Sequence, residues 1–416
     1  MAQADNVKSV AEIISTPAPE QSGKRHWSGR HWLLGSLTAI TIALAILISL
    51  SLAQREPLYQ GKTVAAWAQD LSNPDAKVRA HAEEALRALG PDALRPLTFA
   101  LHRQDFPGKK WIVGLVIKLP RPFKNTLLRV FKTADATSMR ISAAQALAVL
   151  GPEAQAAIPS LARALNDVNP TVCIRSAEAL ARIGKPAVPA LIAAVRTGGL
   201  EVRNSAASSL GLIGPDAAEA VPALLETLQH GPTYDAKQAA HSLGKIGTTA
   251  QPALLGLLKT KDAPHRYLAA YALGVMGNAA SNAIPALLET LADADTEVRR
   301  QALASLQQIK LADRRVIAAC IQRLDDPDEN MRVAVLKALA LVGSAASNAV
   351  PKLEMALKDP SGSVRAGAIM LAGRIGSAAK PTMPSLRAAL RDTDESVREQ
   401  AEFAIRSIEP PPTSRN

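Results

Sequence analysis

Apolar and small residues recur along this chain at helical spacing. In segment 298–309 they stand at Val298, Ala302, Leu306 and Ile309, which form one face of a helix with a period of about 3.6 residues. Most of the other positions in that segment are polar. The pattern predicts an amphipathic helix that buries one face against a neighbour.

Three markers show that this helix belongs to a repeated unit. A glycine recurs in steps of 33, 30, 33, 30, 66 and 33 residues, at Gly151, Gly184, Gly214, Gly247, Gly277, Gly343 and Gly376. A proline recurs at Pro159, Pro189, Pro222, Pro252, Pro285, Pro351 and Pro384. Fourteen residues after each proline comes a third marker, at Cys173, Arg203, Ala236, Arg266, Arg299, Arg365 and Arg398. The glycine-to-proline interval is 8 residues in five units and 5 after Gly184 and Gly247, so one loop varies in length. Such self-similarity indicates a repeat architecture.

Each marker has a physical interpretation. Proline suits the first turn of a helix, so Pro222 opens a short helix A. Glycine adopts positive φ easily and ends helices, so Gly214 ends a helix B that includes Arg203. Between the two helices lies an acidic turn in which Asp295 can accept backbone N–H bonds at the start of helix B. One unit is therefore predicted to be a helical hairpin.

Small side chains mark the predicted contact between hairpins. Three residues after the arginine position stand Ala82, Ala143, Ala206, Ala239, Ala269, Ala302, Ala368 and Ala401. Hydrophobic residues make up 48% of the chain but aromatic residues only 3%, which favours alanine- and leucine-packed helical pairs over a compact globular core.

These motifs resemble the HEAT repeat family, in particular its short bacterial form first associated with phycobilisome lyases. The resemblance rests on Asp394–Arg398 (DESVR), Leu210–Gly214 (LGLIG) and Ala220–Leu224 (AVPAL). It covers residues 63–408 and implies an all-α fold, a right-handed α-solenoid of about ten helical hairpins. Cys173 and Ala236 replace the arginine, Lys310 the glycine and Ala318 the proline, and residues 106–131 form a degenerate unit.

An uncharged apolar segment, residues 32–53, precedes the repeats. As a helix it would extend about 33 Å, enough to span a bilayer core of about 30 Å. Basic residues precede it, so we expect a single-pass transmembrane helix with a cytoplasmic basic tail, 1–31, and the solenoid outside. The alternative is a signal peptide cleaved after Ala53, since Ser51-Leu52-Ala53 offers small residues before Gln54. Both interpretations export the repeats.

The remaining segments complete the predicted domain organisation. Residues 54–62 form a polar tether and residues 409–416 a flexible C-terminal tail. After the tether, Thr63 is expected to be the N-cap of a capping helix that places Val64, Trp67 and Leu71 on one face.

The formal net charge is +11, of which about +10 belongs to the exported part. A basic surface could bind polyanions or anionic lipid. However, many arginines occupy the repeated helix-start position, where they can pair with acidic groups at helix starts or in adjacent units. Nucleic-acid binding is not favoured, because aromatic residues for base stacking are scarce.

No motif points to catalysis. The seven histidines make no H-E-x-x-H or other metal spacing, and the chain lacks the His-Glu dipeptides of HEAT-like di-iron hydroxylases. No cluster suggests a bilin pocket. We therefore expect no catalytic residues, cofactor or metal, and no small-molecule ligand. Cys173 and Cys320 lie too many repeats apart for a disulfide; Cys320 should pack as a small hydrophobe, and Cys173 should be more exposed.

The candidate partner-binding residues are Lys237, His241, Tyr267 and Tyr271, which fall in two consecutive B helices. His241 and Tyr271 occupy the same site in adjacent units, where other units carry Glu84, Gln145, Glu178, Ser208, Ala304 and Lys337. A site so tolerant of polarity should face solvent, where tyrosine makes a good anchor. The alternative is that the rings fill gaps left where Asp235 and His265 replace the usual valine.

The sequence thus predicts a membrane-tethered, non-enzymatic scaffold that presents a solenoid surface to a protein partner. Its expected place is the bacterial cytoplasmic membrane, with the N-terminus inside and the solenoid periplasmic or extracellular. One alternative is a polyanion- or lipid-binding module, and another is an enzyme of the phycobilin-lyase type. The partner's identity is not encoded in a motif, because solenoids carry specificity in scattered surface residues.

Overall fold

The computed structural model describes residues 57–104, 135–261 and 263–409. The predicted cytoplasmic tail (1–31), the transmembrane helix (32–53), the start of the tether (54–56) and the degenerate unit (106–131) lie outside these ranges, as do residues 410–416 of the predicted tail. All that follows concerns the described residues.

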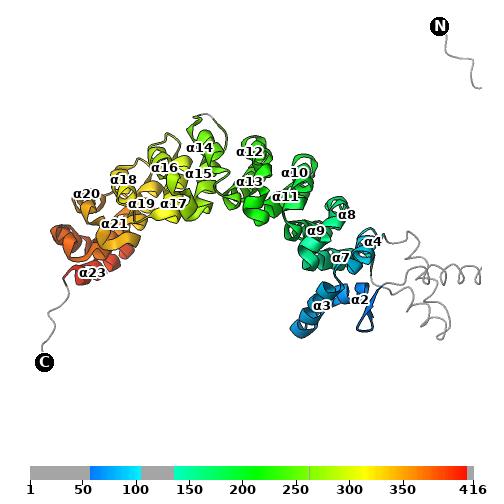
Figure 1. Ribbon diagram of the computed structural model, residues 1–416. Coiled ribbons are helices and arrows are strands. Elements are labelled where there is room, and N and C mark those ends of the chain that lie inside the picture. The colour runs from blue at the N-terminus through cyan, green and yellow to red at the C-terminus, as the bar shows by residue number, and fades with distance from the viewer. Residues whose placement is uncertain (1–56, 105–134, 262, 410–416) are drawn as a thin grey trace, which may run out of the picture. The chain divides into compact units, whose positions relative to one another are not determined.

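The described chain is an α-solenoid in which a short helix A alternates with a longer helix B (Figure 1). The A helices are α2 (Val64–Asp70), α4 (Leu94–Leu101), α8 (Ile158–Ala164), α10 (Val188–Thr197), α12 (Val221–His230), α14 (Gln251–Lys259), α16 (Ile284–Thr290), α18 (Arg314–Gln322), α20 (Val350–Ala356) and α22 (Met383–Ala389). The B helices are α3 (Ala76–Leu89), α7 (Ala136–Leu150), α9 (Pro170–Ile183), α11 (Leu200–Ile213), α13 (Thr233–Ile246), α15 (Arg266–Val275), α17 (Thr296–Lys310), α19 (Glu329–Val342), α21 (Gly362–Ile375) and α23 (Glu395–Ile408). The prediction of an all-α array of helical hairpins is confirmed, and its right-handed sense stays a prediction.

The predicted helix-end signals act as expected. The prolines stand at the first or second residue of their A helices, as Pro222 does in α12. Asp295 caps α17, because its carboxylate accepts the Glu297 N–H at 2.8 Å. The marker glycines all have positive φ, for example 71° at Gly214, which lets the chain turn out of helix B without a Cβ clash.

The connection from helix B to the next helix A explains the variable interval. In the longer form it is a 3₁₀-helix of 7 residues, as in η4 (Gly214–Ala220), and after Gly184 it shortens to η3 (Lys185–Ala187). Other 3₁₀ segments are η1 (Gly90–Ala93), η2 (Gly151–Ala157), η5 (Gly277–Ala283), η6 (Arg323–Asp325), η7 (Gly343–Ala349) and η8 (Gly376–Thr382). The length variation therefore lies in one loop, as predicted.

In one unit, Lys310 and Ala318 replace the marker glycine and the marker proline, and helix A of this unit starts differently. Helix α17 continues through Lys310, and Leu311 keeps right-handed geometry with φ −59°. Asp313 then caps α18 by accepting the Arg315 N–H at 2.8 Å. Ala318, at the proline position, consequently lies inside α18 rather than at its start. An acidic N-cap replaces the proline as the signal that begins this helix.

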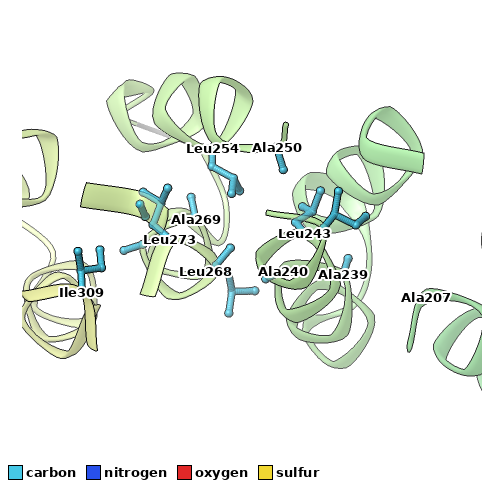
Figure 2. Packing of buried hydrophobic residues seen from close by; sticks show 14 of the residues in the cluster. Ala207, Ala239, Ala240, Leu243, Ala250, Leu254, Leu268, Ala269, Leu273 and Ile309 are labelled. Carbon is cyan, nitrogen blue, oxygen red and sulfur yellow. The ribbon is translucent and has the colours of Figure 1, made fainter. Parts of the chain in front are cut away.

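The alanine position forms the seam between successive hairpins. All eight predicted alanines are at most 1% exposed. Around them leucines complete the core, and Figure 2 shows Leu268 of α15 directed toward Ala240 of α13. Neighbouring B helices contact one another throughout the described array. Because each hairpin buries its apolar face against its neighbours, the core is continuous along the array.

Both cysteines belong to this core. Cys320 is fully buried in α18, as predicted, and burial raises the pKa of its thiol to about 12. The prediction that Cys173 is more exposed is wrong, since it is only 2% exposed. The arginine position lies between successive B helices, and the Cys173 Sγ is 4.0 Å from the Ser205 Oγ of the next one. Burial raises the pKa of Cys173 as well.

Glycines inside the B helices bring successive helices into very close contact. A Cβ added at Gly244 of α13 would stand 2.6 Å from the Val275 Cβ and 2.7 Å from the Ala272 carbonyl oxygen of α15. A Cβ at Gly211 of α11 would meet the Ser242 Cα at 3.0 Å, and one at Gly274 would meet the Ser305 Oγ at 2.8 Å. At Gly244 and Gly274 a side chain would force a shift of the neighbouring helix or side chain, and at Gly211 it would be tight, so glycine permits the close spacing of these B helices.

Ion pairs connect the turns of successive repeats. The Arg299 Nη2 donates to the Asp326 Oδ1 of the next repeat at 2.8 Å, while its Nη1 donates to the carbonyl oxygens of Asp293 and Ala294 in its own turn at 3.0 and 3.1 Å. The same pairing, 27 residues apart, occurs in Arg140–Asp167, Arg266–Asp293, Arg299–Asp326, Arg332–Asp359 and Arg365–Asp392. The predicted pairing of helix-start arginines with acidic groups of adjacent units is thus confirmed.

An aspartate of these ion pairs also accepts a backbone N–H within its own turn. Asp392 accepts the Asp394 N–H at 2.9 Å in addition to its bonds from Arg365, and these donors lower the pKa of Asp392 to about 2. The series is interrupted where Cys173 and Ala236 replace the arginine. Arg203 instead donates to Asp235, which lies 32 residues away and is buried.

A small hairpin covers the first described helix. Strands β1 (Leu58–Tyr59) and β2 (Lys62–Thr63) pair antiparallel, with Leu58 opposite Thr63. The Trp67 Nε1 donates to the Tyr59 carbonyl oxygen at 3.0 Å, and the Lys62 Nζ lies 4.4 Å from the Trp67 ring centroid. The predicted Thr63 cap is confirmed, since its hydroxyl accepts the Ala66 N–H at 3.2 Å. The end of the predicted tether, from Leu58, is therefore folded onto the array. It provides a hydrogen-bond acceptor for the Trp67 indole N–H and shields the Trp67 ring from solvent.

The other predicted tail also begins inside the fold. The Glu409 N–H donates to the Ile405 carbonyl oxygen at 2.9 Å, and its carboxylate lies 3.5 Å from Arg387. Residue 409 thus continues the end of α23 rather than a free tail.

Among the described residues, one stretch, Glu329–Ala356, is long and apolar enough to cross a membrane by length and composition. It comprises α19, η7 and α20, and Gly343 with φ 56° separates the two α-helices. Many of its apolar side chains belong to the continuous core, but Leu341 and Met355 are 75% and 69% exposed.

The glycine contacts give a stability prediction. Gly244→Ala should destabilise the protein by about 1–3 kcal/mol, because the new methyl group overlaps Val275 and the α15 backbone. The control is Gly256→Ala in α14, where an added Cβ meets nothing within 4 Å. It should stabilise by about 0.5–1 kcal/mol through helix propensity. Urea unfolding followed by circular dichroism measures both, and equal effects would contradict the close packing.

A second prediction tests the turn-linking arginines. Arg299→Met should cost about 3–5 kcal/mol, because it leaves the buried Asp326 carboxylate without its cation. Arg300→Met changes the next residue, whose exposed guanidinium pairs only with Glu297 three residues away, and should cost no more than about 0.5 kcal/mol. The same unfolding measurement compares the two; indistinguishable losses would show that the linkage contributes no stability.

Candidate partner-binding surface

The solvent-facing side of each B helix can be described by its position relative to the repeat arginine. Residues one, five and nine positions after it are exposed or half-buried from α11 to α21. The fifth position was predicted to face solvent. Glu84, Ser208, Ala304 and Lys337 there are exposed, whereas Gln145, Glu178, His241 and Tyr271 are half-buried. The prediction thus holds for half of these residues.

The structure brings the four candidate residues together on two adjacent helices. Lys237 and His241 lie one turn apart on α13, and Tyr267 and Tyr271 lie one turn apart on α15. The His241 Nδ1 is 3.1 Å from the Tyr271 hydroxyl, with ring centroids 6.3 Å apart. Helices α13 and α15 are in contact along their length. The predicted equivalence of His241 and Tyr271 in neighbouring units thus appears as a direct contact.

The electrostatics of this contact favour a neutral imidazole. Burial, and then the charge of Lys245, hold the pKa of His241 below its ordinary value. At neutral pH an uncharged Nδ1 can accept a hydrogen bond from the Tyr271 hydroxyl. The arrangement fixes the Tyr271 ring at the surface without leaving its hydroxyl unpaired.

Tyr267 and Tyr271 are neither solvent-exposed anchors nor fully buried gap-filling rings. Tyr267 and Tyr271 are half-buried, with part of each ring packed against the hydrophobic core. Tyr267 also meets the His265 ring edge-on at 6.3 Å between centroids. Lys237 is exposed. The surface therefore presents the outer part of two rigidly held rings beside an exposed cation.

The gap-filling alternative is not supported by Tyr234, the tyrosine next to Asp235. Asp235, which replaces the usual valine, is 2% exposed and accepts the Arg203 Nε at 2.7 Å. The preceding Tyr234 is 68% exposed, so it fills no gap there. His265 begins α15 with φ 58°, in the left-handed region, and its ring contacts Tyr267. A guanidinium, rather than an aromatic ring, thus compensates for the polar substitution at position 235.

Exposed apolar side chains were missed by the sequence reasoning. Leu212, Leu341 and Phe403 on B helices are 71%, 75% and 69% exposed. Their offset from the repeat arginine could have revealed them, since Leu212 and Leu341 stand at the ninth position and Phe403 at the fifth. A leucine at a solvent-facing helix position is uninformative alone, but several along one array mark a surface for partners.

No group of three or more His, Cys, Asp or Glu side chains is placed to hold a metal ion within the described residues. The His102 Nε2 lies 3.1 Å from the Ser160 Oγ, but also 3.3 Å from the Arg163 Nη1. Burial and Arg163 lower the pKa of His102. An imidazole beside a guanidinium is a poor base for activating a serine.

The fold and this surface together define a class of protein: an array of helical hairpins whose B helices expose a continuous side chain surface. The family model of HEAT repeats matches five overlapping segments, 125–211, 158–244, 221–307, 284–360 and 317–406. These cover more than half of the chain, and the protein belongs to the HEAT repeat family.

The chain is also similar, at low sequence identity, to several solved structures. An engineered protein is 22% identical, with 83% of this chain and 98% of that chain covered and a TM-score of 0.36. Kap95p in complex with RanGDP is 12% identical, with 83% of this chain covered and a TM-score of 0.46; this chain spans 61% of its length. The CpcE–CpcF complex of phycocyanin lyase from Nostoc sp. PCC7120 is 22% identical, with 60% and 94% covered and a TM-score of 0.30. No curated protein matches the chain.

The contact between His241 and Tyr271 gives a third prediction. Tyr271→Phe removes the hydroxyl that meets His241, and should destabilise α13 and α15 by about 0.5–1.5 kcal/mol. Tyr267→Phe removes a hydroxyl on the same helix without breaking that bond, and should be nearly neutral. Hydrogen exchange of the α13 and α15 amides measures the local effect; equal protection in both variants would argue against the bond.

Proposed function

We propose that this protein is a membrane-tethered, non-enzymatic scaffold that binds a protein partner through the outer side of its B helices. The observation that carries the proposal is the cluster on α13 and α15, where Lys237, His241, Tyr267 and Tyr271 form one surface. Tyrosines held by packing lose little conformational entropy on binding and bring a large contact area. Membership of the HEAT repeat family supports protein binding as the general role.

The tether is proposed from the sequence. Residues 32–53 carry no charge and follow a basic stretch, which supports a transmembrane helix with the N-terminus inside the cell. We place the solenoid on the outer side of a bacterial cytoplasmic membrane. A signal peptide cleaved after Ala53 would export the same surface without the anchor.

Two other functions have weaker support. A polyanion- or lipid-binding module agrees with the net charge of +11, but the turn arginines that contribute to this charge are engaged with aspartates inside the array. A lyase-type enzyme has a fold neighbour in phycocyanin lyase, but a shared repeat fold does not carry a reaction. Of the three functions, a protein-binding scaffold accounts best for the surface on α13 and α15.

The fourth prediction tests location and partner binding together. In cells whose outer permeability barrier has been opened, a membrane-impermeant crosslinker should join the full chain to a defined protein partner. Tyr267→Ala combined with Tyr271→Ala should reduce the captured amount at least about fivefold, since tyrosine anchors carry much of a binding energy. Tyr234→Ala is the control, since it removes an exposed tyrosine from α13 that lies outside the cluster.

Two results would contradict the proposal. One is protection of the solenoid from the impermeant reagent, with crosslinking only after cell lysis, which would reverse the orientation. The other is undiminished capture by a folded double variant, which would place the partner on another surface. Deletion of residues 32–53 should release the protein from the membrane fraction if that segment is the anchor.

A further inference from the structure

From α11 to α21, the charged residues on the outer side of the B helices are all positive, whereas α3, α9 and α23 carry Glu84, Glu178 and Glu399 at the same offsets. We call the residues one, five and nine positions after the repeat arginine, on α11, α13, α15, α17, α19 and α21, the B ridge. Five of them are exposed cations, namely Lys237, Lys245, Arg300, Lys337 and Arg374. None of the B-ridge residues, all of which are described, is acidic. Four of these six helices, α13, α17, α19 and α21, thus present positive charge to solvent.

These cations differ from the arginines at the helix starts. The helix-start arginines are engaged by aspartates of the next turn, as Arg365 is by Asp392 at 2.7 Å. On the B ridge, the side chain of Arg300 pairs with Glu297, whereas the side chains of the other four cations form no ion pair or hydrogen bond within the described residues. The array therefore neutralises its internal charges and leaves the ridge charges for an external anion.

Apolar groups lie between these cations. Leu212 and Leu341 are 71% and 75% exposed at ninth positions. Tyr267 and Tyr271 present the outer parts of their rings near the middle of the ridge. Consecutive B helices are in contact, so cationic and apolar sites follow one another along a single surface. A ligand that matches it carries negative charges and apolar side chains in one extended chain.

We infer that the B ridge is a docking track for an extended acidic polypeptide segment that carries aliphatic side chains. This inference rests on the proposed scaffold function and names the chemistry of the partner. Six helices about 10 Å apart span about 50 Å, which an extended segment of about 15 residues covers. Carboxylates of that segment meet the ridge cations, and its aliphatic side chains cover the exposed leucines and tyrosine rings.

The ridge fits a polypeptide better than a nucleic acid. Base stacking needs accessible aromatic faces, whereas Tyr267 and Tyr271 pack part of each ring against the core. Exposed leucines contribute nothing to phosphate binding, but they bind aliphatic side chains well. This chain itself has net charge +11, so a different, acidic polypeptide is the expected occupant.

A peptide-binding experiment tests the inference on the full chain in detergent. The probe is a fluorescent peptide of about 16 residues made of Glu-Glu-Leu-Ser repeats, long enough to follow the ridge. Its matched forms replace every Glu with Lys, or every Leu with Ser. We expect the Glu-Leu peptide to bind at least about tenfold more tightly than either matched form, because it alone satisfies both charge and apolar sites.

Two quadruple variants separate the ridge from net charge. The ridge variant carries Lys237→Gln, Lys245→Gln, Lys337→Gln and Arg374→Gln. The control removes the same charge from exposed residues in or directly after A helices, through Arg196→Gln, Lys259→Gln, Lys358→Gln and Arg391→Gln. The ridge variant should bind the Glu-Leu peptide at least about tenfold more weakly, and the control should change affinity less than about threefold. Circular dichroism confirms that both variants are folded.

Several outcomes would overturn the inference. These are absence of binding to the Glu-Leu peptide, equal losses in both quadruple variants, and tighter ridge-dependent binding of a single-stranded oligonucleotide. The scaffold proposal is tested separately by partner capture. If a partner is captured but the ridge variant captures it equally well, the scaffold stands and the acidic-segment inference fails. If the peptide binds at the ridge but no cellular partner is crosslinked, the scaffold proposal fails at its own test.

Discussion

The close approach of successive B helices is the constraint on which the rest of this structure depends. At Gly244 and Gly274 an added Cβ would stand less than 3.0 Å from an atom of the neighbouring helix, and at Gly211 it would meet one at 3.0 Å. Alanines three residues after the repeat arginine bury the rest of the seam. This tight spacing aligns equivalent positions of neighbouring helices, so that His241 can meet Tyr271 at 3.1 Å. Without it, the side chains of separate repeats would not form one surface.

The same spacing decides where charge is used. Because adjacent turns lie close together, an arginine such as Arg299 reaches the carbonyl oxygens of its own turn and the carboxylate of the next. Acidic groups of the turns are thereby engaged inside the array. Within the part of the chain that the structure describes, Arg300 is the one exposed cation of the B ridge whose side chain has an acidic partner. The array thus separates structural ion pairs from a basic surface available for binding.

Several local departures from the repeat show how one substitution is compensated by another. Where Ala236 replaces the arginine, Asp235 is buried and takes its cation from Arg203 of the preceding repeat. Where Lys310 and Ala318 replace glycine and proline, Asp313 begins the helix instead. Cys173 stands at the arginine position, but its side chain is short. It therefore stays buried between successive B helices. The architecture tolerates these changes since each repeat is stabilised by its neighbours on both sides.

The sequence by itself determined the local structure and its repetition. Proline, glycine, N-cap and alanine positions specified where helices begin, end and pack, because each acts through its own backbone or its immediate neighbours. The fold class and the membership of Lys237, His241, Tyr267 and Tyr271 in one surface followed from the same counting. Tertiary structure decided what depends on contacts between repeats. Only three-dimensional packing showed Cys173 as buried, Tyr271 as half-buried and bonded to His241, the segment from Leu58 as folded onto Trp67, and Leu212 and Leu341 as exposed. The physical reason is that burial at a given helix position is set by the neighbouring helices, and a single repeat's sequence does not specify how closely they approach.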